Sequence, residues 1–237
     1  MNYFAHGRRF TDDPYFLAGT AVPDWLNVVD RRVRIRSKQA ERHRDAADPR
    51  AAHVAAGIVQ HHRDDAWFHS TRAFAELSLS ICHQLRRDLP SDDGFRPHFL
   101  GHILVEILLD AALVAEDPRR LDAYYAAIDA LDAQMVASAV NIMAGRPARN
   151  LATFIGMSSR ERFLSDYADD AKLLVRLNQV MRRVGLPLLP GAFVESLAEP
   201  RRIVAQRRDE LMRNQPTLAR AQARVERGKS LLTCASG

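Results

Sequence analysis

Histidine and carboxylate residues recur at four-residue spacing in two separate segments of the chain. The first series is His61, Asp65 and His69, and the second is His102, Glu106 and Asp110. Residues four apart lie on one face of an α-helix, so neighbouring members of each series could share a metal ion. A single pair of this kind is also typical of an ordinary ion pair on a helix surface.

The second series lies within a strongly apolar segment, residues 98–115. Charged groups inside such a helix require a partner or a metal ion, because an isolated buried charge is very costly. Two facing helices that each supply histidine and carboxylate ligands form di-metal sites in helical bundles. We therefore predict a site for two divalent ions, and the mixed nitrogen and oxygen ligands favour zinc, manganese or iron.

Side chains beside these ligands are expected to assist them. His62, Asp64 and Asp110 are predicted to hold the imidazoles in one tautomer by hydrogen bonds. Asp65 and Glu106 are the predicted catalytic carboxylates, because they could orient an attacking water or act as a general base. Arg63 could contact a phosphate oxygen of a substrate, although a solvated side chain is the simpler interpretation.

The elements that must position these residues are predicted to be helices. Asp48-Pro49 predicts the start of a helix over residues 49–72, and Asp117-Pro118 predicts another that runs to about residue 144. Residues 14–30 are expected to form short helical pieces broken at Gly19 and Pro23, and Ser158 or Ser159 is expected to cap a helix that ends near residue 184. The strand-like alternation of residues 32–36 is too short to build a sheet. The prediction is an all-α, multi-helix bundle with the metal site between helices of its N-terminal half.

The composition indicates a globular protein with a basic C-terminal end. Hydrophobic residues make up 47% and charged residues 27% of the 237 residues. Residues 201–237 contain nine Lys/Arg against three acidic residues, whereas residues 1–200 contain 25 against 26. We expect one helical hydrolase-like domain over residues 1–200 and a basic helical tail over 201–237. The tail could attract anionic lipid or an acidic protein partner, or it could form a solvated helical face. Nucleic acid is disfavoured because no aromatic residue interleaves the charges.

Signals of secretion or membrane insertion are not recognisable. The first residues lack a basic region followed by an apolar core, and no run of about 18 apolar residues predicts a transmembrane segment. The two cysteines, Cys82 and Cys234, provide neither a disulfide framework nor a zinc site. We expect a cytoplasmic protein.

Three motifs within residues 1–115 resemble known enzymes. They are Met1-Asn-Tyr-Phe-Ala-His6, Leu17-Ala-Gly19 followed by Asp24, and Ala56-Gly57-Ile58-Val-Gln-His61-His-Arg-Asp-Asp65. They resemble the acyl carrier protein phosphodiesterases, which are helical, metal-dependent and distantly HD-domain-like. The same residues are similar to the zinc-dependent phospholipase C/nuclease group. In that group a His, a Pro-Asp, a His-x-x-x-Asp, a further His and a His-x-x-x-Glu ligate a metal cluster in this order.

The two resemblances imply a ligand set. In chain order these ligands are His6, Asp24, His61, Asp65, His69, His102 and Glu106. The phosphodiesterase resemblance implies acyl carrier protein as the substrate, whereas the phospholipase-like order of ligands implies a phospholipid-like phosphoester. The phospholipases also use a processed N-terminal amine as a ligand, and an unprocessed Met1 is not expected to replace it.

The sequence therefore predicts a metal-dependent phosphoester hydrolase, specifically a phosphodiesterase. Two alternatives stay open. One is a non-hydrolytic di-metal helical protein that activates oxygen or stores metal. The other is a degenerate helical scaffold that binds an acidic partner through the basic tail and holds no metal. No motif assigns a role to residues 116–237, and the oligomeric state is not predicted.

Overall fold

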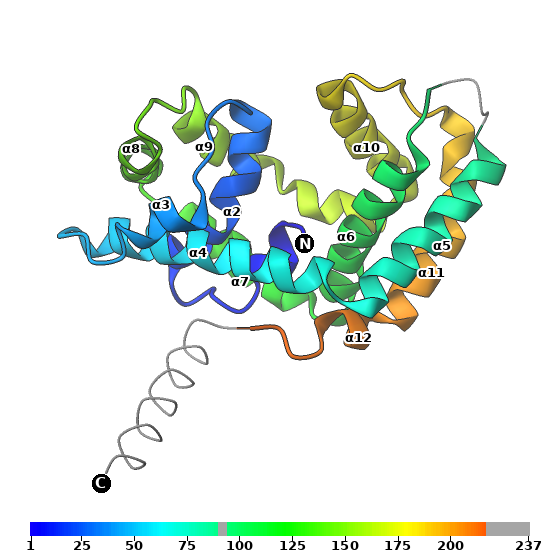
Figure 1. Ribbon diagram of the computed structural model, residues 1–237, viewed down its shortest axis with the longest axis horizontal. Helices are drawn as coiled ribbons and strands as arrows, with labels where there is room; N and C mark the ends of the chain where they lie inside the picture. The colour runs from blue at the N-terminus through cyan, green and yellow to red at the C-terminus, as the bar shows by residue number, and fades with distance from the viewer. Residues whose placement is uncertain (90–93, 217–237) are drawn as a thin grey trace, which may run out of the picture.

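The computed structural model describes residues 1–89 and 94–216, and within these ranges every regular element is a helix (Figure 1). This confirms the predicted all-α class. The α-helices are α1 (Tyr3–Gly7), α2 (Pro14–Val29), α3 (Ser37–Glu41), α4 (Pro49–His69), α5 (Arg72–Asp88), α6 (Pro97–Glu116), α7 (Pro118–Asp129), α8 (Ala133–Ala144), α9 (Leu151–Glu161), α10 (Asp170–Val184), α11 (Ala198–Gln206) and α12 (Arg208–Met212). The two 3-10 helices are η1 (Phe163–Ala168) and η2 (Gly191–Leu197).

Helices α2 and α4 cross in very close contact. A Cβ atom on Gly19 would lie 2.2 Å from the Val54 carbonyl oxygen, and one on Gly57 would lie 2.1 Å from that of Phe16. Neither distance is possible for a real side chain, so the crossing requires glycine on both helices. Gly19 is therefore a packing residue within a helix, not the break that the sequence predicted.

Helix α2 also continues through Pro23, contrary to the predicted short pieces. Proline inside a helix costs about 3 kcal/mol, because it removes one backbone hydrogen bond and crowds the preceding turn. The buried face of α2, which includes Leu17, Trp25 and Leu26, outweighs this cost. Asp13 caps the helix by accepting a hydrogen bond from the Phe16 backbone N–H, 3.0 Å away.

The two helices that carry the predicted ligands lie near their predicted positions. Helix α4 begins at Pro49 behind an Asp48 cap, as predicted, but it ends at His69 because Thr71 caps α5 instead. Helix α6 begins at Pro97 and is packed against α5 along much of its length. In Figure 1 the N-terminal residues lie between α4 and α6, near the centre of the molecule.

The predicted boundaries in the C-terminal half are less accurate. The helix expected to run from 118 to 144 is two helices, since Asp132 caps a new helix by accepting from the Gln134 and Met135 backbone N–H groups. Ser158 and Ser159 lie inside α9 rather than at a cap, and Asp169 caps α10 in their place.

Part of the predicted basic tail belongs to the folded body. The boundary expected at residue 200 falls inside α11, where Val204 is fully buried, and Leu211 of α12 is buried as well. Helix α11 packs against α6. The remainder of the predicted tail, from residue 217 onward, lies outside the described residues.

One described helix, α6, is long and apolar enough to cross a membrane by length and composition. Such a segment was not predicted from the sequence, because His102, Glu106 and Asp110 interrupt its apolar run. About 56% of the apolar window is buried inside the protein, and a buried core helix meets the same criterion.

Candidate metal centre

Six of the seven predicted ligands form two compact groups. Within each group the potential ligand atoms all lie within 4.8 Å of one another. The groups are His6, His61 and Asp65, and His69, His102 and Glu106. Each therefore contains two imidazoles and one carboxylate.

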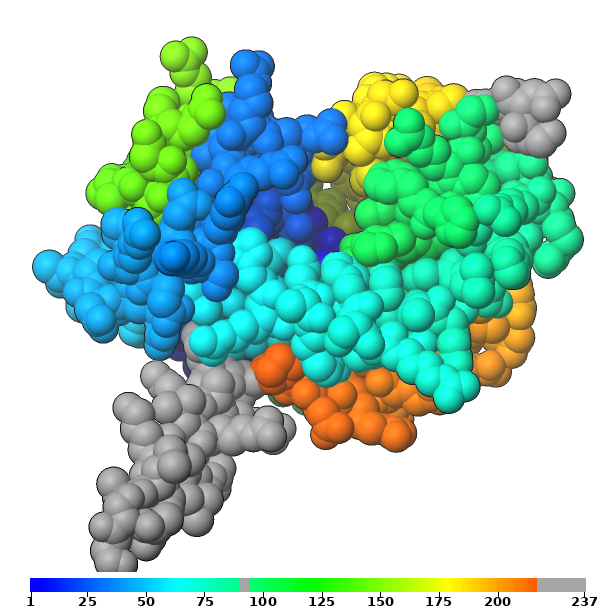
Figure 2. Space-filling model, viewed as in Figure 1, coloured from blue at the N-terminus to red at the C-terminus, as the bar shows by residue number. Residues whose placement is uncertain are grey.

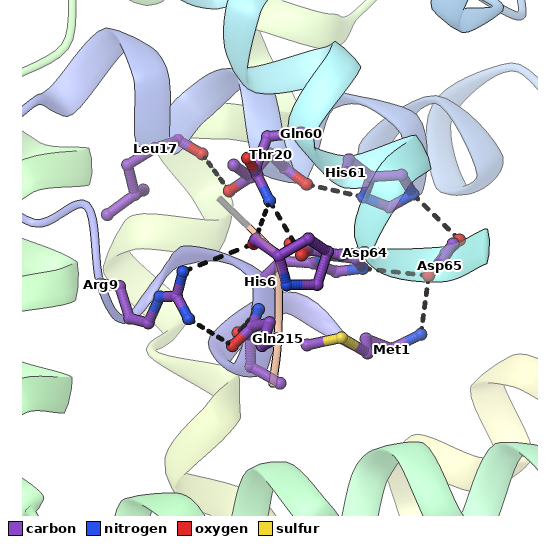
Figure 3. Close-up of polar contacts among 12 residues, drawn as sticks. Met1, His6, Arg9, Leu17, Thr20, Gln60, His61, Asp64, Asp65 and Gln215 are labelled. Carbon is purple, nitrogen blue, oxygen red and sulfur yellow. Dashed lines mark hydrogen bonds and ion pairs between the residues drawn. The ribbon is translucent and has the colours of Figure 1, made fainter. Parts of the chain in front are cut away.

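The first group joins α1 to α4. The Nε2 atom of His6 lies 3.2 Å from Asp65 Oδ1, and His61 Nε2 lies 3.3 Å from Asp65 Oδ2. The two imidazole rings are stacked with their centroids 4.1 Å apart, and both are buried. The two Nε2 atoms therefore contact the two oxygens of the same carboxylate, that of Asp65 (Figure 3).

The second group joins α4 to α6 and is more open to solvent. Glu106 Oε1 lies 2.8 Å from His69 Nε2 and 3.2 Å from His102 Nε2. The His69 and His102 side chains are 34% and 41% exposed, whereas Glu106 is mostly buried. A ligand could therefore approach this group from solvent.

The α-amino group of Met1 lies between the two groups. It donates to Asp65 Oδ1 at 2.7 Å and to Glu106 Oε1 at 3.0 Å. The expectation that Met1 does not serve as a metal ligand stays a prediction, because a protonated amine has no free electron pair to bind an ion. Burial alone would lower the pKa of this amine, but the two carboxylates outweigh it and raise the pKa to about 10. Asp65 and Glu106 therefore both bind the same positively charged group, the Met1 ammonium, which links the two ligand groups.

The distances in both groups suit a divalent ion. Ligand atoms about 2.1 Å from a tetrahedral ion lie about 3.4 Å from one another. Three of the four separations between Nε2 and carboxylate oxygen atoms, at 3.2 to 3.3 Å, are close to this value, whereas the fourth, between His69 and Glu106, is 2.8 Å, the length of a hydrogen bond. His6 Nε2 is buried, and its nearest polar partner in the described structure is Asp65 Oδ1, 3.2 Å away, so an ion there would replace the proton between them. Two imidazoles with one carboxylate also leave open positions on the ion, as catalytic sites require.

The imidazoles of the first group are oriented by hydrogen bonds between their Nδ1 atoms and oxygen acceptors. His61 Nδ1 lies 2.8 Å from the Thr20 carbonyl oxygen, and His6 Nδ1 lies 3.2 Å from Asp64 Oδ2 (Figure 3). Asp64 in turn accepts a 2.9 Å hydrogen bond from Gln60. The structure therefore brings Asp64 to the place expected for it, while sequence reasoning missed the Thr20 carbonyl and Gln60.

In the metal-free centre, the carboxylates hold His6 in its charged form. Burial would lower the pKa of His6, but hydrogen bonds with Asp64 and Asp65 raise it to about 9. The pKa of Asp65 falls below its usual range, because His6, His61 and the Met1 amine outweigh the opposite effect of burial. Divalent ions would supply the same positive charge without a proton.

The structure gives Asp110 a role different from the predicted one. Its two carboxylate oxygens accept hydrogen bonds from the backbone N–H groups of Phe4 and Ala5, at 2.9 and 2.8 Å, and contact no imidazole nitrogen. Asp110 therefore holds α1, the helix that carries His6, against α6, and it also interacts with the charge of His6.

His62 and Arg63 are not where the sequence analysis expected them. His62 Nε2 lies 2.7 Å from the Ile35 carbonyl oxygen, so His62 ties α4 to the segment before α3 instead of orienting a ligand. Arg63 lies two residues before Asp65 and so on a different face of α4. It does not line the cavity described next, and its Nη1 atom is buried without a hydrogen-bond partner in the described structure.

A cavity of about 520 Å³ adjoins the centre. Met1, Asp24 and Glu106 contribute to its wall. Asp24, the seventh predicted ligand, belongs to neither group, and its Oδ2 atom has no hydrogen-bond partner in the described structure. Burial raises the pKa of Asp24, and the neighbouring His61 and His6 lower it. In Figure 2 the hollow is visible between the α2–α3 region, α6 and α10, with N-terminal residues at its floor.

Sequence reasoning also missed four arginines in the wall of this cavity. They are Arg31, Arg34, Arg176 and Arg183. They come from the α2–α3 connection and from α10, so no local motif joins them to the histidines. Only the folded structure brings them to the same cavity.

The chain was compared with known proteins. No family model, curated protein or solved structure matches it.

Proposed function

We propose that this protein is a metal-dependent phosphoester hydrolase. The observation that carries the proposal is a pair of His₂-carboxylate groups beside one arginine-lined cavity. His6, His61 and Asp65 would hold one divalent ion, and His69, His102 and Glu106 a second. The resemblance of residues 1–115 to acyl carrier protein phosphodiesterases and zinc-dependent phospholipases supports the same reaction class.

The residues of the chain divide the work of phosphoester hydrolysis. When bound, divalent ions supply Lewis-acid chemistry that polarises the phosphoryl group and makes water more acidic. Asp65 and Glu106 each lie beside two imidazoles that could bind the same ion, so we assign both carboxylates as metal ligands. Asp24 lines the cavity with one unpaired oxygen and a raised pKa, so it is the carboxylate we assign to accept the proton of the attacking water.

The test is metal content together with hydrolysis of bis(p-nitrophenyl) phosphate. We expect the wild-type protein to bind about two zinc, manganese or iron ions and to hydrolyse the diester, as in other two-metal sites. The double variant His61→Ala/His102→Ala should lose both properties. The matched control is His53→Ala/His98→Ala, which changes one exposed histidine on each of the same two helices and should retain both.

Two other results would redirect the assignment. Two histidines and one carboxylate are also the ligand set of oxygen-activating iron sites. Iron binding with oxygen consumption and no diester hydrolysis would therefore support the non-hydrolytic alternative. A wild-type protein that binds no zinc, manganese or iron after reconstitution would contradict the metal centre and leave the scaffold interpretation.

A further inference from the structure

The cavity beside the candidate metal centre has a lining of mixed chemistry. It contains apolar side chains, among them Phe99, Ile103 and Phe154. It also contains the arginines of the α2–α3 connection and of α10. A ligand that fills this cavity therefore meets both apolar surface and positive charge.

The four arginines differ in their partners. Arg176 is neutralised, since it forms ion pairs with Asp166 at 2.6 Å and Glu161 at 3.3 Å. Arg31, Arg34 and Arg183 form no ion pair with any residue in 1–89 and 94–216, and their guanidinium groups are at least partly exposed. The only acidic residue in the cavity wall other than Asp24 and Glu106 is Glu161, which is already paired.

Backbone contacts hold these three arginines together. Arg31 Nη1 donates to the Arg183 carbonyl oxygen at 2.8 Å, and Arg34 Nε donates to the Arg31 carbonyl oxygen at 3.3 Å. Val33 and Ile35, the residues on either side of Arg34, are buried and hold the α2–α3 connection against the hydrophobic core. The contact between Arg31 and the end of α10 thus fixes both arginine-bearing segments at one side of the cavity.

Three cavity-lining arginines without carboxylate partners in the described structure make this part of the cavity positively charged. Like charges held close together repel one another, and a bound anion removes that repulsion. Guanidinium groups form forked, charge-assisted hydrogen bonds that match the oxygens of a phosphate. A cationic group at the same place would be repelled.

We propose that Arg31, Arg34 and Arg183 bind a second phosphate group of the substrate, distinct from the phosphoester that is cleaved. The substrate class is then a phosphoester that carries a further terminal phosphate on an apolar or aromatic spacer, and esters with a cationic group are excluded. The part of this proposal that concerns the substrate rests on the hydrolase function proposed above, whereas anion binding by the arginines does not.

The first experiment measures the anion site without any metal. Pyrophosphate binding to chelator-treated, full-length protein is followed by isothermal titration calorimetry. The variant Arg31→Gln/Arg183→Gln should bind pyrophosphate about 100-fold more weakly than the wild type, because two charge-assisted contacts are lost. The matched control is Arg32→Gln/Arg182→Gln, which makes the same change of net charge at the exposed neighbouring positions and should bind like the wild type.

The second experiment measures specificity in the metal-loaded protein. Three p-nitrophenyl phosphodiesters are compared, whose second alcohol is propanol, 3-phosphopropanol or choline. The phosphopropyl ester should have the lowest KM, and Arg31→Gln/Arg183→Gln should raise that KM at least tenfold relative to the KM of the propyl ester, which removes the preference for the second phosphate. Thermal melting of each variant confirms that it is folded.

The outcomes separate the two proposals. Equal pyrophosphate affinity of the two double variants, or no binding by the wild type, would overturn the anion site even if the diesters are hydrolysed. Arginine-dependent pyrophosphate binding without metal or hydrolysis would leave the anion site standing and overturn the hydrolase function.

Discussion

At the scale of single residues, Asp110 shows how one buried carboxyl group positions a segment that carries a ligand. It is fully buried in α6 and accepts hydrogen bonds from two successive backbone N–H groups of α1. Burial raises its pKa from the ordinary 3.8 to about 7, although those two hydrogen bonds act in the opposite direction. The folded protein therefore binds the Asp110 proton more tightly than the unfolded chain does.

This shift predicts a pH dependence of stability. Because the pKa is raised on folding, the contribution of Asp110 to the free energy of unfolding is full below about pH 4 and is lost as the pH rises to about 7. The loss amounts to about 4 kcal/mol in total. Asp110→Asn should remove this decline, and urea unfolding of the metal-free protein across this range measures it. Asp209→Asn, at an exposed position, should follow the wild type. Parallel curves for all three proteins would contradict the assignment.

Asp24 gives a second prediction at this scale. If Asp24 accepts a proton and is not a ligand, Asp24→Asn should lower kcat for bis(p-nitrophenyl) phosphate by about 10²- to 10⁴-fold without changing metal content. The His61→Ala/His102→Ala variant should instead lose both. Loss of metal from Asp24→Asn, measured by mass spectrometry of the purified protein, would return Asp24 to the ligand set.

The sequence predicted some of these residues better than others, for a physical reason. The series on α4 and α6 depend only on helical spacing, so the alignment of His61 with Asp65 and of His102 with Glu106 could be predicted from local sequence. His6 and Asp24 lie far from those helices in sequence and were reached only through resemblance. The Thr20 carbonyl could not be predicted at all, because its role depends on how α2 crosses α4.

At the scale of elements, the crossing of α2 and α4 determines the position of the first ligand group. Gly57 lies one turn before His61, and Thr20, next to Gly19, supplies the carbonyl oxygen that His61 contacts. The absence of side chains at Gly19 and Gly57 brings the two backbones close enough for this contact. The glycines therefore act on the centre through the distance between two helices.

Gly57→Ala should consequently damage both the fold and the centre. The added methyl group would meet the Phe16 carbonyl oxygen and the Gly19 backbone, and separating the helices should cost about 1–3 kcal/mol of unfolding free energy. Metal affinity should fall about tenfold or more as the Thr20 contact lengthens. Chemical unfolding and competition with a chelator measure the two effects.

The matched control for this change is Gly156→Ala in α9. A Cβ atom there has nothing within 4 Å, so alanine should stabilise the helix by about 0.5–1 kcal/mol. Equal effects of the two substitutions would show that the crossing tolerates a side chain and would contradict the packing argument.

The element boundaries show the limits of local signals. Asp-Pro pairs correctly predicted the starts of α4 and α7, because capping and proline geometry are local properties. Pro23 was wrongly predicted to end a helix, since the gain from burying the face of α2 arises only in the folded protein. The break between α7 and α8 was also missed, although Asp132 is a recognisable cap.

At the scale of the whole molecule, residues 215 and 216 contact α1 and α4, the helices that carry the first candidate ligand group. Gln215 is 3% exposed and accepts a hydrogen bond from Arg9 at 3.2 Å, and its Nε2 atom lies 3.5 Å from the Ala5 carbonyl oxygen. The Pro216 carbonyl oxygen accepts a 2.9 Å hydrogen bond from Gln60, the residue that also holds Asp64 (Figure 3). Both ends of the described chain therefore support His6.

Gln215→Ala should weaken this support. We expect a loss of about 1–3 kcal/mol of unfolding free energy, because buried polar partners are left without hydrogen bonds. Gln206→Ala, which removes an exposed glutamine that accepts only from Arg202, should change the free energy by less than about 0.5 kcal/mol. Urea unfolding compares the two variants. Equal losses of unfolding free energy would show that the buried contacts of Gln215 stabilise the protein no more than an exposed glutamine does.

These long-range contacts also determine when the centre can form. The contact between Gln215 and Ala5 joins residues separated by 210 positions, and that between Met1 and Glu106 joins residues separated by 105. Closing such large loops costs entropy that is recovered only when the distant partners are in place, which makes these steps slow and late in folding. Because α1 precedes its partners in the chain, its last contacts exist only after the residues up to Gln215 have been synthesised. His6 thus precedes the other candidate ligands in the chain but is among the last of them to be fixed, so the metal site proposed above can be complete only after these long-range contacts have formed.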